Sequence, residues 1–116
     1  MLRMVLIVLI GGFILNCADI DRSQTIRVSG RVCDRESKKP VTGNVLEYYD
    51  EGTIKSKEFY WKGIRHGMSY HYFPSQQLSM KGKYKDGLKD GEWRYQHENG
   101  SLMKIEVYED GELQPD

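Results

Sequence analysis

The chain has 116 residues, enough for one domain, and its 17 basic and 17 acidic residues leave no net charge at neutral pH. The two signs are interspersed along the chain, as in Lys85, Asp86, Lys89 and Asp90. Nucleic-acid binding needs a concentrated positive field, so this composition argues against a nucleic-acid partner.

An apolar run opens the chain. Arg3 precedes this run, which extends from Met4 to Leu15 and is followed by Asn16-Cys17. As a helix, these 12 residues would span about 18 Å, less than the roughly 30 Å hydrocarbon core of a bilayer. We therefore expect residues 1–16 to be a helical signal segment, and a stable transmembrane helix is the weaker interpretation.

Residues Ile14 to Cys17 resemble a bacterial lipobox, in which the cysteine becomes the lipidated first residue of the mature chain. The resemblance implies lipidation at Cys17 and attachment to the membrane of the cell envelope, at the outer membrane or in the periplasm of a Gram-negative cell. Asn16 departs from the pattern, because Gly, Ala or Ser usually precedes the cysteine, so secretion and an uncleaved anchor are the alternatives. A disulfide between Cys17 and Cys33 requires that Cys17 carry no lipid; otherwise we expect Cys33 to be a half-buried strand residue.

Residues 17–25 are polar and lack apolar periodicity, so we expect a flexible tether. The folded domain is predicted to span residues 26–116. Apolar and polar residues alternate from Ile26 to Val32, which predicts one strand. A charged loop, Asp34 to Pro40, follows.

A repeat of 24 residues fills the rest of the chain, in three copies: 43–66, 67–90 and 91–114. Equivalent positions carry the same residue in each copy. The clearest columns are two of glycine and one of tyrosine: Gly43, Gly67 and Gly91; Gly63, Gly87 and Gly111; Tyr60, Tyr84 and Tyr108. Repetition at a fixed period predicts an array in which each unit borrows its core from its neighbours.

Two turn signals divide each repeat. Dipeptides such as Asp86-Gly87 and Asn99-Gly100 favour tight hairpin turns, because both residues tolerate positive φ angles. Turns at alternating intervals of 11 and 13 residues predict an antiparallel meander. The middle repeat has Phe73-Pro74-Ser75-Gln76 at its first turn, and the proline predicts a wider or bulged turn there.

Several segments resemble the bacterial variant of the MORN repeat: Tyr48 to Gly52, Lys62 to Gly67, Tyr84 to Trp93 and Asn99 to Leu102. The resemblance implies an all-β fold, with one hairpin per repeat laid side by side into an elongated single-layer antiparallel meander. Many such proteins carry an antitoxin-type label, and related repeats are associated with scaffolding, lipid contact or protein assembly. None of these roles assigns a catalytic residue.

The tyrosine column, together with Tyr72 and Trp93, forms the set of candidate binding residues. Aromatic residues at one frame position would stack as a ladder two strands apart and stabilise a thin sheet. The alternative is an aromatic face that binds sugar rings, peptide or lipid headgroups.

The polar residues predict no catalytic or metal site. His71 and His97 would lie roughly 9 to 10 Å apart in equivalent strands, too far to share an ion, and we expect neither enzymatic activity nor a cofactor. We expect an interaction or scaffolding module whose last strand, Ser101 to Tyr108, pairs with an unknown protein or a second copy by strand addition. The alternatives are a glycan- or lipid-headgroup-binding module and an antitoxin-like partner of a toxin.

Overall fold

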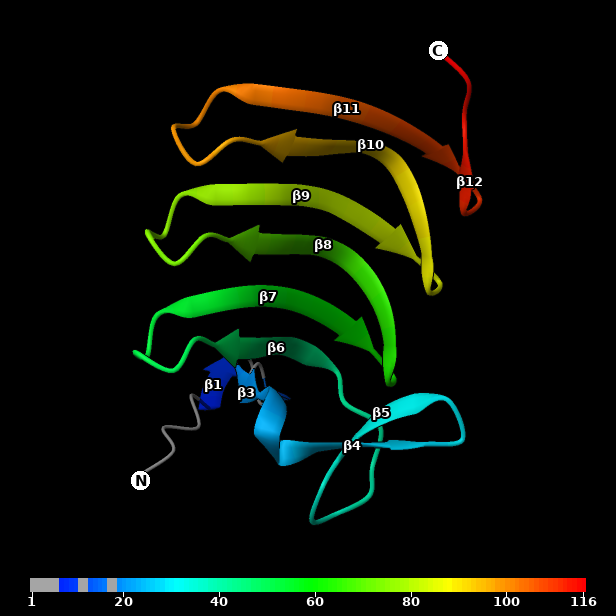
Figure 1. Ribbon diagram of the computed structural model, residues 1–116. Helices are drawn as coiled ribbons and strands as arrows, with labels where there is room; N and C mark the ends of the chain where they lie inside the picture. Colours follow the sequence, from blue (N-terminus) through cyan, green and yellow to red (C-terminus); the bar gives the residue numbers. More distant parts are fainter. Residues whose placement is uncertain (1–6, 11–12, 17–18) are drawn as a thin grey trace.

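A computed structural model describes residues 7–10, 13–16 and 19–116 of the chain (Figure 1). Its main sheet has eight strands in the order β12-β11-β10-β9-β8-β7-β6-β3. These strands are β3 (Ile20–Asp21), β6 (Gly43–Tyr48), β7 (Ile54–Trp61), β8 (Ile64–Tyr72), β9 (Leu78–Lys85), β10 (Leu88–Gln96), β11 (Leu102–Glu109) and β12 (Glu112–Leu113). From β6 to β12 every neighbouring pair is antiparallel, so the predicted all-β meander is confirmed.

Each 24-residue repeat supplies one hairpin: β6–β7, β8–β9 and β10–β11. The hairpins are joined by two-residue turns in which both residues have positive φ, for example 50° at Asp86 and 86° at Gly87. This turn also ties successive hairpins together, because the Gly87 N–H donates to the Arg65 carbonyl at 2.8 Å. The turn glycines therefore fix both the hairpin geometry and the stacking of the units.

Strands β8 and β10 bend sharply in Figure 1, and a glycine of the first column lies at each bend. Gly67 has φ 93° and Gly91 has φ 72°, a backbone conformation that glycine adopts without steric cost. Residues on the two sides of a bend come together: the Lys89 Nζ lies 4.7 Å from the centre of the Trp93 ring. The sheet thus curls around one face, here called the inner face, which carries Glu58, Tyr60, Tyr84, Trp93 and Tyr108.

The turn of the middle repeat is not widened, so the prediction from its proline is wrong. The Phe73 N–H donates to Gln77 and the Gln76 N–H to Phe73, both at 2.8 Å, as His97 and Gly100 do one repeat later. Gln76 takes the left-handed conformation, with φ 72°. Its side-chain amide accepts from the Ile54 N–H at 3.3 Å and donates to the Ile54 carbonyl at 3.0 Å. These two bonds to the preceding hairpin offset the cost of a non-glycine residue there.

The segment before the repeats differs from its prediction in two ways. Residues 26–32 form a hairpin, β4 (Thr25–Val28) and β5 (Arg31–Asp34), because Ser29 and Gly30 both adopt positive φ and reverse the chain. The expected tether is also ordered from Ile20 onwards: β3 pairs in parallel with β6, and a 3-10 turn, η1 (Arg22–Gln24), follows. Ile20 packs against a small core of Val32, Val41, Val45 and Tyr60, which explains the order.

Two short strands occupy part of the expected helical signal segment. β1 (Ile7–Ile10) pairs antiparallel with β2 (Phe13–Asn16), in keeping with the strand preference of their aliphatic and aromatic residues. Residues 1–6, 11–12 and 17–18 lie outside the described residues, so lipidation of Cys17 and its disulfide to Cys33 stay predictions. Cys33 itself is buried. Within the described ranges, no helix has the length and hydrophobicity to cross a bilayer.

Candidate functional site

Cations and aromatic rings alternate along the inner face. The Arg65 guanidinium lies 5.8 Å from the Tyr60 ring and 5.4 Å from the Tyr84 ring. One repeat later, the Lys89 Nζ lies 4.9 Å from the Tyr108 ring. The predicted tyrosine ladder therefore exists, but cations fill the spaces between its rings and stabilise it by cation–π attraction.

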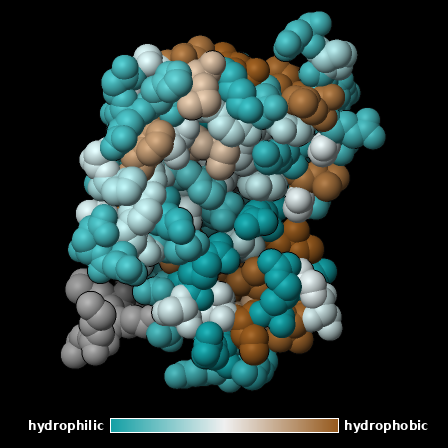
Figure 2. Space-filling model, viewed as in Figure 1, coloured by the Kyte–Doolittle hydropathy of each residue, from teal (hydrophilic) through white to brown (hydrophobic). Residues whose placement is uncertain are grey.

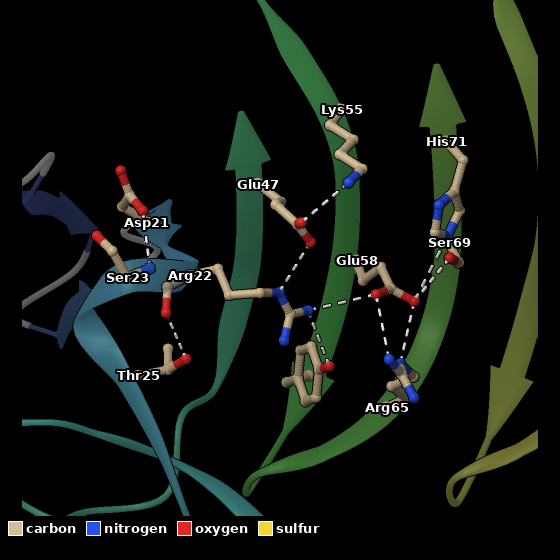
Figure 3. Close-up of polar contacts among 11 residues, drawn as sticks. Asp21, Arg22, Ser23, Thr25, Glu47, Lys55, Glu58, Arg65, Ser69 and His71 are labelled. Atoms are coloured by element: carbon tan, nitrogen blue, oxygen red, sulfur yellow. Dashed lines mark hydrogen bonds and ion pairs between the residues drawn. The ribbon is translucent and has the colours of Figure 1, made fainter. Parts of the chain in front are cut away.

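The N-terminal segment extends this ladder by one step. Arg22 of η1 reaches across β6 and lies 6.0 Å from the Tyr60 ring, opposite the side that Arg65 contacts (Figure 3). Arg22 also donates to the Tyr60 hydroxyl at 3.3 Å. The frame position before Arg65 is Val41, which has no charge, so Arg22 supplies a cation that the first repeat lacks.

Glu58 is the centre of the polar contacts in Figure 3. It is only 3% exposed, and it meets cations from both sides: Arg22 Nη2 at 3.4 Å and Arg65 Nε at 3.0 Å. The Ser69 hydroxyl donates to it at 2.9 Å, and the His71 Nε2 lies 3.9 Å away. The network joins η1, β7 and β8, so it fixes the N-terminal segment onto the first two hairpins.

This environment changes the charge state of the pair. Burial alone would raise the pKa of Glu58, but hydrogen bonds from His71 and Ser69 and the charge of Arg65 outweigh it and lower the pKa to about 2. Burial would likewise lower the pKa of Arg65, and Glu58 raises it above its ordinary value. Both groups are therefore held in their charged forms, which is typical of an ion pair that stabilises a fold.

Side-chain sizes are matched between neighbouring hairpins. Trp93 is fully buried and lies over Gly82 of the preceding hairpin, where any Cβ would overlap the indole ring. The Trp93 ring also meets Tyr84 edge to face, with 5.0 Å between the ring centres. One repeat earlier the same frame position is Ser69, which is opposite Glu58 in the sheet. A small residue thus accompanies the glutamate and a large ring accompanies the glycine.

The predicted binding residues divide into three groups. Tyr60 and Trp93 are 2% and 0% exposed, so their rings form the core of the inner face and present no surface to a ligand. Tyr84 and Tyr108 lie on the same face and are half-buried beside the cations. Tyr72 follows His71 in β8 and therefore lies on the opposite face, away from the other four. The structure does not bring the five together as one site.

Sequence reasoning missed Arg22, Glu58, Arg65 and Lys89. A signal existed for one pair, because Arg65 and Lys89 are 24 residues apart and share a frame position. Arg22 and Glu58 are separated by 36 residues with no common pattern. Among the described residues, no group of three or more His, Cys, Asp or Glu side chains could hold a metal ion.

The open edge of β11 is the second candidate surface. Within the described residues, β12 pairs only with Tyr108 and Glu109 of this strand. The side chains of Leu102, Met103 and Val107 are about half exposed, at 51%, 51% and 48%. Figure 2 shows hydrophobic residues gathered along the top of the molecule, where β11 runs. An exposed apolar edge strand is a template for pairing with another chain.

Repeated hairpins in one curled meander, without a catalytic group or metal cluster among the described residues, define the chain as a β-repeat protein. The family model of the MORN repeat variant matches two segments, residues 41–62 and 89–110, and these matches support a MORN repeat protein. The middle hairpin between them has the same turns and frame positions. No curated protein and no solved structure shows a significant match to the chain.

Proposed function

We propose that this chain is a non-enzymatic interaction module of the cell envelope, which binds a protein by strand addition at the edge of β11. The observation that carries the proposal is the unpaired stretch of β11 from Leu102 to Val107 with its exposed apolar side chains. Backbone groups at such an edge supply affinity, and alternate side chains supply specificity. A MORN repeat β-meander fits a protein-interaction module.

The inner face supports a structural rather than a catalytic role. Its carboxylate at Glu58 is committed to Arg22 and Arg65, and two of its rings are buried. A glycan- or lipid-binding face would need those rings at the surface. The contacts therefore favour the edge over the inner face as the place where a partner binds.

Substitution of Ile105 by proline tests the role of the edge. Proline removes a backbone donor, and edge strands tolerate it, so Ile105→Pro should keep the fold and lose the partner. The measurement is co-purification from detergent-solubilised envelopes, with circular dichroism as the check on folding. Leu88→Ala is the matched control, because Leu88 is equally exposed, at 50%, but lies in β10. Equal capture of the same proteins by Ile105→Pro would refute the proposal.

Attachment to the envelope is proposed through lipid on Cys17, from the lipobox resemblance of residues 14–17. Labelling with radioactive palmitate should occur in the wild type and disappear in Cys17→Ser. Equal labelling of both proteins would show that Cys17 is not the lipidated residue.

A further inference from the structure

We propose that the partner at this edge is a second copy of the chain, with the two β11 strands paired antiparallel about a two-fold axis at Ile105. The inference rests on the proposed function and names its occupant. Two curled sheets would then join into one continuous sheet.

The backbone of β11 presents the groups that such a pairing needs. The Val107 carbonyl accepts a hydrogen bond from the Gln114 N–H at 2.8 Å, so it points away from β10. Successive residues of a strand direct their backbone groups to opposite sides, which points the N–H and C=O of Ile105 to the same open edge as Val107. Two Ile105 residues facing each other can exchange both hydrogen bonds. Farther along, Met103 of the second copy would replace Gln114 at the Val107 carbonyl.

The side chains of β11 are complementary to themselves in this register. Lys104 of each copy faces Glu106 of the other, which gives two ion pairs of opposite charge on the inner face. The two residues already lie on that face within one chain, with Lys104 Nζ 3.9 Å from Glu106 Oε1 and 53% and 20% side-chain exposure. On the outer face, Met103 meets Val107 and Ile105 meets Ile105. Cross-strand pairs of these kinds stabilise antiparallel sheets.

Other registers lack this match. A shift of one residue places Lys104 opposite Ile105 or Val107, and a shift of two places Lys104 opposite Lys104 or Glu106 opposite Glu106. Like charges directly opposite each other are destabilising. Among the nearby alignments, the one centred on Ile105 is therefore favoured.

The other end of the main sheet argues for a closed pair rather than a longer array. There β3 pairs with β6 at Val45 and Leu46, and Arg22 extends over β6 to Glu47 and Glu58. This edge is already covered by the chain's own N-terminal segment. A two-fold contact through β11 uses the same surface on both copies and leaves no second open edge for further addition.

The test measures association of the full chain in detergent by sedimentation velocity over a range of concentrations. A pairing of this length belongs to the small, transient interfaces, so we expect a concentration-dependent dimer in the wild type. Lys104→Glu and Glu106→Lys should each weaken it about tenfold or more, because like charges then face each other twice. An equimolar mixture of the two variants should recover a heterodimer, since every facing pair regains opposite charges.

Recovery in the mixture also controls for folding, because each variant carries its own substitution there. A wild type that stays monomeric at every concentration, single variants that dimerise like the wild type, or a mixture no better than its components would overturn the inference. The proposed function is judged separately. If the wild type is monomeric but Ile105→Pro loses its envelope partner, self-pairing is refuted while strand addition at β11 stands.

Discussion

Replacing Glu58 by glutamine keeps the size of this side chain and removes its charge. The pKa of Glu58 is lowered from an ordinary 4.5 to about 2, so the folded chain binds this proton less readily than the unfolded chain does. The charged carboxylate therefore stabilises the fold fully above about pH 4.5, and the contribution is lost as the pH falls through about 2. A pKa difference of this size corresponds to about 3 kcal/mol. Glu58→Gln should lose that amount at neutral pH.

Urea unfolding followed by circular dichroism measures the free energy of unfolding of both proteins. We expect a difference of about 3 kcal/mol at pH 7, which falls to about half at pH 3 as the wild type loses its advantage. Glu47→Gln is the matched control, because Glu47 pairs with the same Arg22 at 3.5 Å but its side chain is 39% exposed. Its cost should stay below about 1 kcal/mol. A Glu58→Gln variant within 1 kcal/mol of the wild type at pH 7, or a difference unchanged at pH 3, would refute the reasoning.

Three further substitutions test other contacts, each by its effect on urea unfolding. Gly82→Ala should cost about 1–3 kcal/mol, because the new methyl group overlaps the Trp93 ring, and an unchanged midpoint would contradict that packing. Arg22→Ala should cost about 1–2 kcal/mol and speed hydrogen exchange in β3, and exchange at the wild-type rate would show that Arg22 does not hold this segment. Gln76→Ala should cost about 1 kcal/mol because it loses both bonds to Ile54, whereas Gln76→Gly should be nearly neutral because relief at φ 72° compensates. Equal losses in the two Gln76 variants would mean that the left-handed backbone carries no cost.

The repeated part of the fold follows from local sequence signals. Two-residue turns such as Asp86-Gly87 need only the conformational freedom of their own residues, so a fixed spacing of turn dipeptides predicts hairpins and their antiparallel order. The bends at Gly67 and Gly91 were present in the same pattern as a glycine column. What the column did not reveal is that these glycines curl the sheet rather than connect strands.

The remaining features depend on contacts between distant residues. Arg22 sits in a polar segment with no periodicity, and its order comes from Glu58 and Tyr60, which lie 36 and 38 residues away. The Gln76 exception was visible, but its explanation requires the position of Ile54 in the neighbouring hairpin. The aromatic column was predicted correctly as architecture, and its cations were overlooked because Arg65 and Lys89 are different residue types at one frame position.

The exchange of volume between hairpins gives the repeats a fixed order. Trp93 of the third unit needs the empty space at Gly82 of the second, whereas Ser69 of the second leaves room for Glu58 of the first. If the second and third units were interchanged, the indole would meet a buried carboxylate and the serine would leave a void. The copies are therefore not equivalent modules: a duplication or shuffling of whole units would succeed only with compensating changes at the junction. Their individual differences encode which neighbour each unit accepts.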